Sequence, residues 1–119
     1  MKEIVIASLS MDFALRTINL YKYLHDNKNE YVMSKQLLRC GTSIGANIAE
    51  SEHAQSQADF LSKLYISLKE ANETKYWITL LNKAGYLTDI EFESIMNDLK
   101  IIIGTLVNTI KKTKENPKE

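Results

Sequence analysis

Apolar residues recur at every third or fourth position along four parts of the chain, the spacing that lines one face of an α-helix. Short polar segments separate these four stretches, which cover residues 4–25, 34–53, 56–84 and 89–111. Four amphipathic helices joined by short turns predict an all-α fold, an antiparallel up-down-up-down four-helix bundle formed by residues 1–110. The remaining residues, 111–119, are mostly charged, and we expect them to form a flexible tail.

The apolar face of each helix predicts the hydrophobic core. In the first stretch this face holds Thr17 together with Ile6, Leu9, Phe13, Leu20 and Leu24. In the third stretch it holds Phe60, Leu61, Leu64, Leu68, Ala71, Ile78 and Leu81. The fourth stretch has the most regular repeat, formed by Phe92, Ile95, Leu99, Ile102, Leu106 and Ile110.

Several residues mark where the helices begin and end. Ser34 is a candidate N-cap for the second helix, because its hydroxyl can accept a hydrogen bond from a free backbone N–H. Gly85 fits the position just after a helix, where the backbone turns left-handed. Thr88 and Glu91 have the spacing of a capping box, which predicts that the fourth helix begins at about residue 89.

The second stretch combines an apolar face with unusually small residues. Gly41, Gly45 and Ala49 follow one another at every fourth position on that face. Each glycine inside a helix costs about 1 kcal/mol relative to alanine, so two of them suggest that a neighbouring backbone approaches closely. The alternative is a loop at residues 40–43 between two short helices.

The first and third helices carry a second apolar face. In the first helix it is formed by Ile4, Met11, Leu15 and Ile18, and in the third by Tyr65, Ile66, Tyr76, Trp77 and Leu80. The fourth helix, by contrast, is expected to be apolar on one side only. So much apolar surface predicts an interface with a second copy of the chain. The alternative is a monomer whose tyrosines lie loosely on its surface.

A polar arc runs along the opposite side of the second helix, formed by Arg39, Ser43, Asn47 and Glu50. Its simplest interpretation is a solvated face, or a hydrogen-bonded network that fixes helix packing or subunit register. The alternative interpretation is a nucleic-acid contact or the rim of a central channel.

The same stretch carries a family resemblance, in Arg39, Gly41–Ile44 and Ala46–Glu50. These residues resemble the signature of bacterial four-helix-bundle proteins encoded within intervening sequences of large-subunit ribosomal RNA genes. The likeness continues through residues 57–60, 68–74, 76–77 and 85–88. It implies a four-helix bundle that assembles into a pentameric ring. A related bundle is the accessory subunit of reverse transcriptases in diversity-generating retroelements, but that type is typically basic.

Charge gives little support for nucleic-acid binding, because 15 basic residues balance 15 acidic ones. The candidate nucleic-acid contacts are Lys35, Arg39, Lys63, Lys69, Lys75, Lys111, Lys112 and Lys114. The lysines of the third helix are six residues apart and spiral around it instead of forming one stripe. The lysines of the tail fit a solubilising role better, although a ring would repeat any binding patch several times.

No catalytic, cofactor or metal site is predicted. The single cysteine, Cys40, excludes an internal disulfide and fits a reducing compartment, and neither His25 nor His53 has a partner at ligand spacing. The chain has no run of about 20 apolar residues that would cross a membrane. The N-terminus has too short an apolar run for a signal peptide, so we expect a cytoplasmic protein.

Together these features predict a non-enzymatic, homo-oligomeric helical scaffold that acts by binding a protein, an RNA or a ribonucleoprotein. The alternative is a nucleic-acid-binding accessory subunit of a reverse transcriptase, and the balanced charge of the chain counts against it. We expect no membrane partner and no small-molecule substrate.

Overall fold

Four long helices make up the computed structural model, which describes residues 2–116, with side chains from Val5 onward. The helices are α1 (Lys2–Lys28), α2 (Met33–Ser51), α3 (Gln57–Lys83) and α4 (Asp89–Glu115). The described residues contain no strand, so the prediction of an all-α fold is confirmed. Helix α4 continues to Glu115, so most of the tail expected at residues 111–119 is helical. Residues 117–119 of that tail lie outside the described part of the chain.

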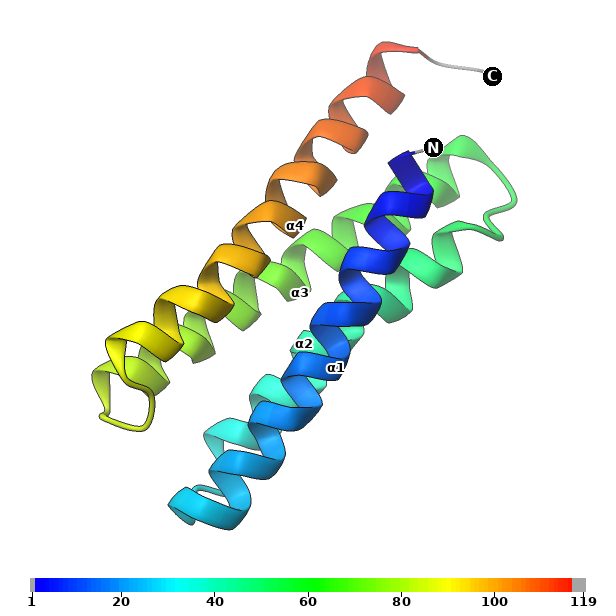
Figure 1. Ribbon diagram of the computed structural model, residues 1–119. Coiled ribbons are helices and arrows are strands. Elements are labelled where there is room, and N and C mark those ends of the chain that lie inside the picture. Colours follow the sequence, from blue (N-terminus) through cyan, green and yellow to red (C-terminus); the bar gives the residue numbers. More distant parts are fainter. Residues whose placement is uncertain (1, 117–119) are drawn as a thin grey trace.

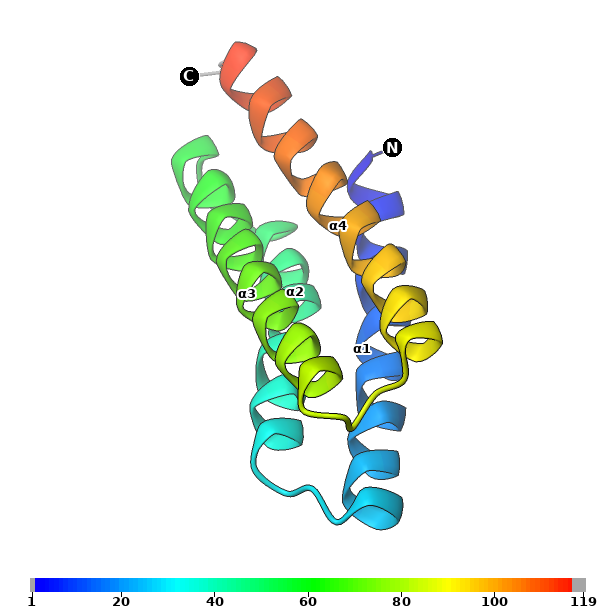
Figure 2. The same ribbon diagram turned by 90° about the vertical axis from the view of Figure 1, so that its left-hand side faces the viewer.

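The helices form an elongated bundle of about 50 × 21 × 19 Å. The chain descends along α1, returns along α2, descends again along α3 and rises along α4 (Figure 1). Helix α2 packs extensively on α1 and α3, whereas the contact between α1 and α4 is the sparsest in the bundle. The turn between α1 and α2 extends beyond the turn between α3 and α4, as both views show (Figures 1 and 2).

All four helices contribute to one hydrophobic core. Its largest fully buried side chains are Phe13, Leu24, Leu37, Ile44, Leu64, Ile78, Leu81, Leu99 and Leu106. The predicted stripes supply this core, but their outer members are only half-buried and pack against its edge, namely Leu9, Leu20, Phe60, Leu61, Leu68 and Phe92.

Helix α2 is continuous through residues 40–43, which excludes the loop alternative. It approaches α1 so closely at Gly41 that an added Cβ would lie 2.7 Å from Cγ2 of Thr17. At Gly45 an added Cβ would lie 3.3 Å from the backbone oxygen of Ser10. On its other side α2 accepts a hydrogen bond at the Ile44 carbonyl from the buried Ser67 hydroxyl, at 2.9 Å. Small residues therefore set the spacing of α2 against both neighbours.

The predicted N-cap at Ser34 is wrong, because Ser34 lies inside α2 and its hydroxyl donates back to the Glu30 carbonyl. The side chain of Glu30 caps the helix instead, accepting backbone N–H groups of Val32, Met33 and Ser34 at 2.7–3.0 Å. Burial alone would raise the pKa of the Glu30 carboxyl, but these hydrogen bonds from Met33, Ser34 and Val32 bring it below its ordinary value. A carboxylate suits this position because a helix N-terminus favours negative charge.

The turn between α3 and α4 follows the prediction. Gly85 has a φ of 88°, the left-handed conformation that glycine adopts without strain. Thr88 accepts from the Glu91 N–H at 3.2 Å while the Glu91 carboxylate accepts from the Thr88 N–H at 2.9 Å. The capping box is therefore confirmed.

Candidate functional site

Exposed apolar side chains gather on the outer faces of α1 and α3. Met11 and Leu15 are 63% and 54% exposed on α1, and Tyr76 is 59% exposed on α3. Tyr65 and Ile66 are also exposed, whereas Ile18 is half-buried. We call Tyr65, Ile66 and Tyr76 the α3 ridge.

Two members of the expected α3 face differ from the prediction. The ring of Trp77 packs against the core, and its Nε1–H donates to Oε2 of Glu73 at 3.1 Å. Leu80 is also half-buried. At Trp77 the amphipathic indole turns its apolar body inward and its single donor toward a neighbouring carboxylate.

The expectation that α4 is apolar on one side only is wrong. Ile90 is 83% exposed, and Ile101 and Val107 are exposed farther along the same helix. These residues lie between the members of the regular core repeat of α4, so the repeat alone does not reveal the second apolar face. Apolar surface outside the core is therefore present on α1, α3 and α4.

A shallow groove of about 330 Å³ runs between α1 and α2. Small side chains dominate its lining, namely Ala7, Ser10 and Ala14 from α1, and Thr42, Gly45, Ala46 and Ala49 from α2. The larger side chains of Met11, Ile48 and Glu52 complete the lining. The groove is concave because the small residues that bring α1 and α2 together leave little side-chain volume between them. It contrasts in shape with the bulky side chains of the α3 ridge.

The polar arc of α2 forms specific bonds to α3. The Arg39 guanidinium bridges two carboxylates of α3, lying 3.3 Å from Oε1 of Glu70 and in hydrogen-bond contact with Oε2 of Glu73. The hydrogen bonds from Trp77 and Arg39 lower the pKa of the Glu73 carboxyl, and the hydrogen bond to Glu73 raises the pKa of Arg39. This network joins α2 to α3.

The other members of the arc are also engaged. The Asn47 amide donates to the Ser43 carbonyl at 2.9 Å, within α2. The Glu50 carboxylate lies 3.0 Å from the Lys63 ammonium of α3, and that hydrogen bond raises the pKa of Lys63. The arc therefore forms bonds both within α2 and to α3.

The structure does not gather the candidate nucleic-acid contacts into one patch. Arg39 and Lys63 are paired with carboxylates, and the Lys114 ammonium donates to the Tyr65 hydroxyl at 3.2 Å. The remaining lysines are exposed but scattered, with Lys35 in the first turn of α2, Lys69 and Lys75 on α3, and Lys111 and Lys112 near the far end of α4. The phosphate backbone needs clustered positive charge, so this set does not define a site as a whole.

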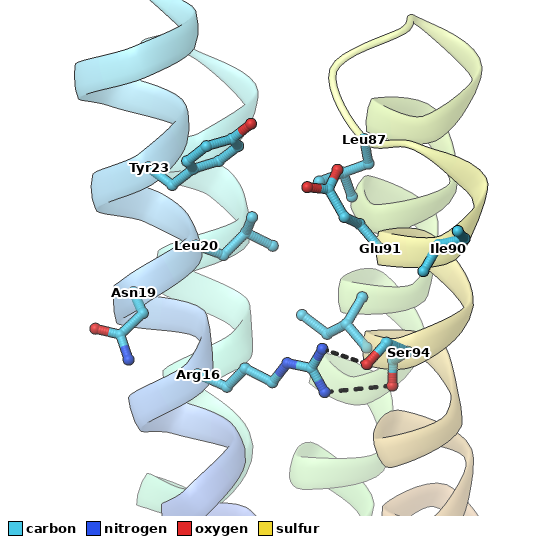
Figure 3. Close-up of a pocket in the computed structure, with 9 residues that line it drawn as sticks. Arg16, Asn19, Leu20, Tyr23, Leu87, Ile90, Glu91 and Ser94 are labelled. Carbon is cyan, nitrogen blue, oxygen red and sulfur yellow. Dashed lines mark hydrogen bonds between the residues drawn. The ribbon is translucent and has the colours of Figure 1, made fainter.

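A cleft of about 420 Å³ opens between α1 and α4 (Figure 3). Its floor is apolar, formed by Leu20, Leu87 and Ile95, and Arg16 crosses it. The two terminal nitrogens of Arg16 donate to the carbonyl and hydroxyl of Ser94, at 3.3 and 2.6 Å, and Nη1 also lies 2.7 Å from Asp98. The main charged group of the cleft is thus engaged in holding α1 to α4.

Cys40 lies fully buried in the core, and burial raises the pKa of its thiol, so it lacks the thiolate character of a reactive cysteine. Within residues 2–116, no group of three or more His, Cys, Asp or Glu side chains gathers to hold a metal. None of the helices in this part of the chain is long and apolar enough to cross a membrane.

One cluster was not anticipated from the sequence. Tyr21 and His25 near the end of α1 and Tyr31 in the following turn bring three rings together. The i, i+4 spacing of Tyr21 and His25 was a signal that could have found two of them. The position of Tyr31 depends on the conformation of the turn.

Comparison with known proteins places the chain in a family. The profile described as 23S rRNA-intervening sequence protein matches residues 2–108. A crystal structure of a protein with unknown function from the S23 ribosomal protein family of Bacteroides thetaiotaomicron is 55% identical, with a TM-score of 0.92. That match covers 93% of this chain and 99% of the other. A search of curated proteins finds no match. The chain belongs to the 23S rRNA-intervening sequence protein family.

Proposed function

We propose that this protein is a non-enzymatic cytoplasmic scaffold, a homo-oligomeric ring of up-down-up-down bundles that binds RNA or a ribonucleoprotein. The observation that carries the proposal is the pair of exposed apolar surfaces of unlike shape, the groove between α1 and α2 and the α3 ridge. A groove on one copy and a ridge on the next make a head-to-tail contact, which closes into a ring when the rotation per subunit divides a full turn. The family resemblance favours five subunits.

Bulky side chains fill a groove lined by alanine and glycine more completely than small ones. Tyr65 and Tyr76 supply large rings at low conformational cost, and their hydroxyls can stay at the wet edge of an interface. The apolar area removed from water would provide the driving force for assembly. A ring would also present every surface site several times, which raises avidity for an extended ligand such as RNA.

The mass of the protein in solution tests the proposal, measured by light scattering coupled to size exclusion. We expect a mass near five times the 13.6 kDa of one chain. Tyr65→Lys combined with Tyr76→Lys should lower the mass toward that of one chain without loss of helicity, because the new charges would be buried without partners. Asn108→Lys, an exposed site on α4, is the matched control and should leave the mass unchanged.

A monomeric wild-type protein would refute the ring. Loss of helicity in the double variant would instead place the two tyrosines in the core of the monomer.

A further inference from the structure

The turn between α1 and α2 carries a cluster of three rings that the core does not require. The centroids of Tyr21 and His25 are 5.8 Å apart, and those of His25 and Tyr31 are 4.8 Å apart with an edge-to-face angle of 71°. Tyr31 is 51% exposed, and the side chain of His25 is 47% exposed. We call Tyr21, His25 and Tyr31 the turn cluster.

The backbone of the turn holds Tyr31 outward. Asn29 has a positive φ of 54°, which reverses the chain, and its side chain accepts a hydrogen bond from the Tyr31 hydroxyl at 2.9 Å. The buried Glu30 fixes the next residues through its hydrogen bonds to the start of α2. Tyr31 is thus an ordered ring held at the surface, which lowers the entropic cost of binding.

The position of the turn makes the cluster accessible. The α1–α2 turn extends past the α3–α4 turn and forms one tip of the elongated bundle (Figure 2).

Exposed lysines outnumber exposed carboxylates in the chain segment that carries the cluster. Lys22, Lys28 and Lys35 are exposed on the last turns of α1 and the first turn of α2. Two carboxylates lie in the same segment, but that of Glu30 is only 6% exposed and is compensated by backbone N–H groups. Asp26 is therefore the one solvent-exposed carboxylate among residues 21–35, and its Oδ1 lies 3.0 Å from Nδ1 of His25.

Exposed rings interleaved with lysines suit one kind of partner. Unpaired bases stack on aromatic side chains, and phosphates bind nearby cations, with little dependence on sequence. A base-paired duplex offers its phosphates but keeps its bases stacked inside. A purely anionic protein surface would use the lysines but would leave the rings without a role.

We propose that the turn cluster binds the unpaired bases of a single-stranded nucleic acid, with Lys22 and Lys35 contacting its phosphates. This inference rests on the proposed RNA-binding function and assigns that function to the α1–α2 turn. Of the nucleic-acid contacts predicted from the sequence, only Lys35 belongs to this site. Bases and phosphates are common to RNA and DNA, so both are included in the test.

The first experiment measures binding of a fluorescently labelled, mixed-sequence RNA of about 12 nucleotides by anisotropy at low salt. Tyr31→Ala should weaken binding about tenfold, since it removes one stacking ring. Tyr31→Phe keeps the ring and should bind like the wild type. Equal binding by Tyr31→Ala and wild type would overturn the proposal, as would equal binding of a duplex of the same sequence.

The second experiment examines charge. Lys22→Gln combined with Lys35→Gln should reduce the slope of log affinity against log salt by about 1.4, the value for two phosphates on a single strand. Lys69→Gln with Lys75→Gln removes the same charge from α3 and should leave the slope unchanged. An equal effect of the two pairs would mean that only net charge matters and would overturn the assigned site.

A DNA strand of the same sequence distinguishes the two sources of the ligand. Weaker binding of DNA would assign the partner as RNA, and equal binding would support single strands of both kinds. Light scattering on the same samples separates this inference from the ring proposal. Failure of the wild type to bind either strand would overturn both the RNA-binding function and the turn-cluster site. Wild-type binding that Tyr31→Ala does not weaken would overturn the site alone, and a monomeric mass would overturn the ring alone.

Discussion

The contact between Gly41 and Thr17 leads to a sharp prediction about stability. An added Cβ at position 41 would lie 2.7 Å from Cγ2 and 2.8 Å from Oγ1 of Thr17, a fully buried side chain. Gly104 offers a matched control inside α4, because a Cβ added there would meet nothing within 4 Å. Both positions are helical, so replacement by alanine gives the same gain in helix propensity at each.

That gain is about 1 kcal/mol per glycine. Gly104→Ala should therefore raise the free energy of unfolding by about 0.5–1 kcal/mol. Gly41→Ala has the same gain but must also push Thr17 or the α1 backbone aside, and overpacking of this kind costs about 1–3 kcal/mol. Since the propensity gain cancels, the two variants should differ in stability by about 1–3 kcal/mol.

Urea unfolding followed by circular dichroism, at one fixed protein concentration, measures this difference. Combining Gly41→Ala with Thr17→Ala removes the two clashing atoms and should recover part of the loss, as a positive coupling energy in a double-mutant cycle. If Gly41→Ala proves as stable as Gly104→Ala, then α1 and α2 do not approach as closely as described.

Three further predictions concern helix packing and helix ends. Gly45→Leu should destabilise the protein by about 1–3 kcal/mol in thermal unfolding, because the side chain would meet the backbone of Ser10, and an unchanged melting temperature would refute this. Glu30→Gln should cost about 0.5–2 kcal/mol at neutral pH. Since the folded pKa of Glu30 lies below its ordinary 4.5, this stabilisation is present above 4.5 and is lost as the pH falls through the folded pKa, so wild type and variant should converge in acid. Thr88→Ala should cost about 1 kcal/mol in urea unfolding, through loss of the capping box, and an unchanged midpoint would contradict it.

Periodicity predicted the elements of this fold well. The four helices, the core positions of α4 and the capping box at Thr88 follow from local spacing, which one helix dictates without its neighbours. The small residues of α2 also predicted a contact between helices. A glycine inside a helix lowers stability, so its presence indicates that another helix lies close against it.

Other features depend on contacts between distant parts of the chain. Both Ser34 and Glu30, four residues earlier, have side chains that can cap the N-terminus of α2. The conformation of the turn places the Glu30 carboxylate against the free N–H groups, which the sequence does not show. Sequence alone likewise did not show that Arg39 of α2 and Lys63 of α3 each pair with a carboxylate across the α2–α3 interface. The predicted set of nucleic-acid contacts therefore included basic residues that are engaged in ion pairs. The turn cluster was not predicted, because it depends on the conformation of the turn.

The order of the helices around the bundle has a consequence for how the protein folds. Within residues 2–116, each helix packs chiefly on its neighbour in sequence, and the sparse contact between α1 and α4 joins the first helix to the last. Such a topology has low contact order, which favours folding on a microsecond-to-millisecond timescale. During synthesis, α1, α2 and α3 can associate before α4 has left the ribosome. Docking of α4, with the Arg16 bridge to Ser94 and Asp98, would then join the last helix to the first.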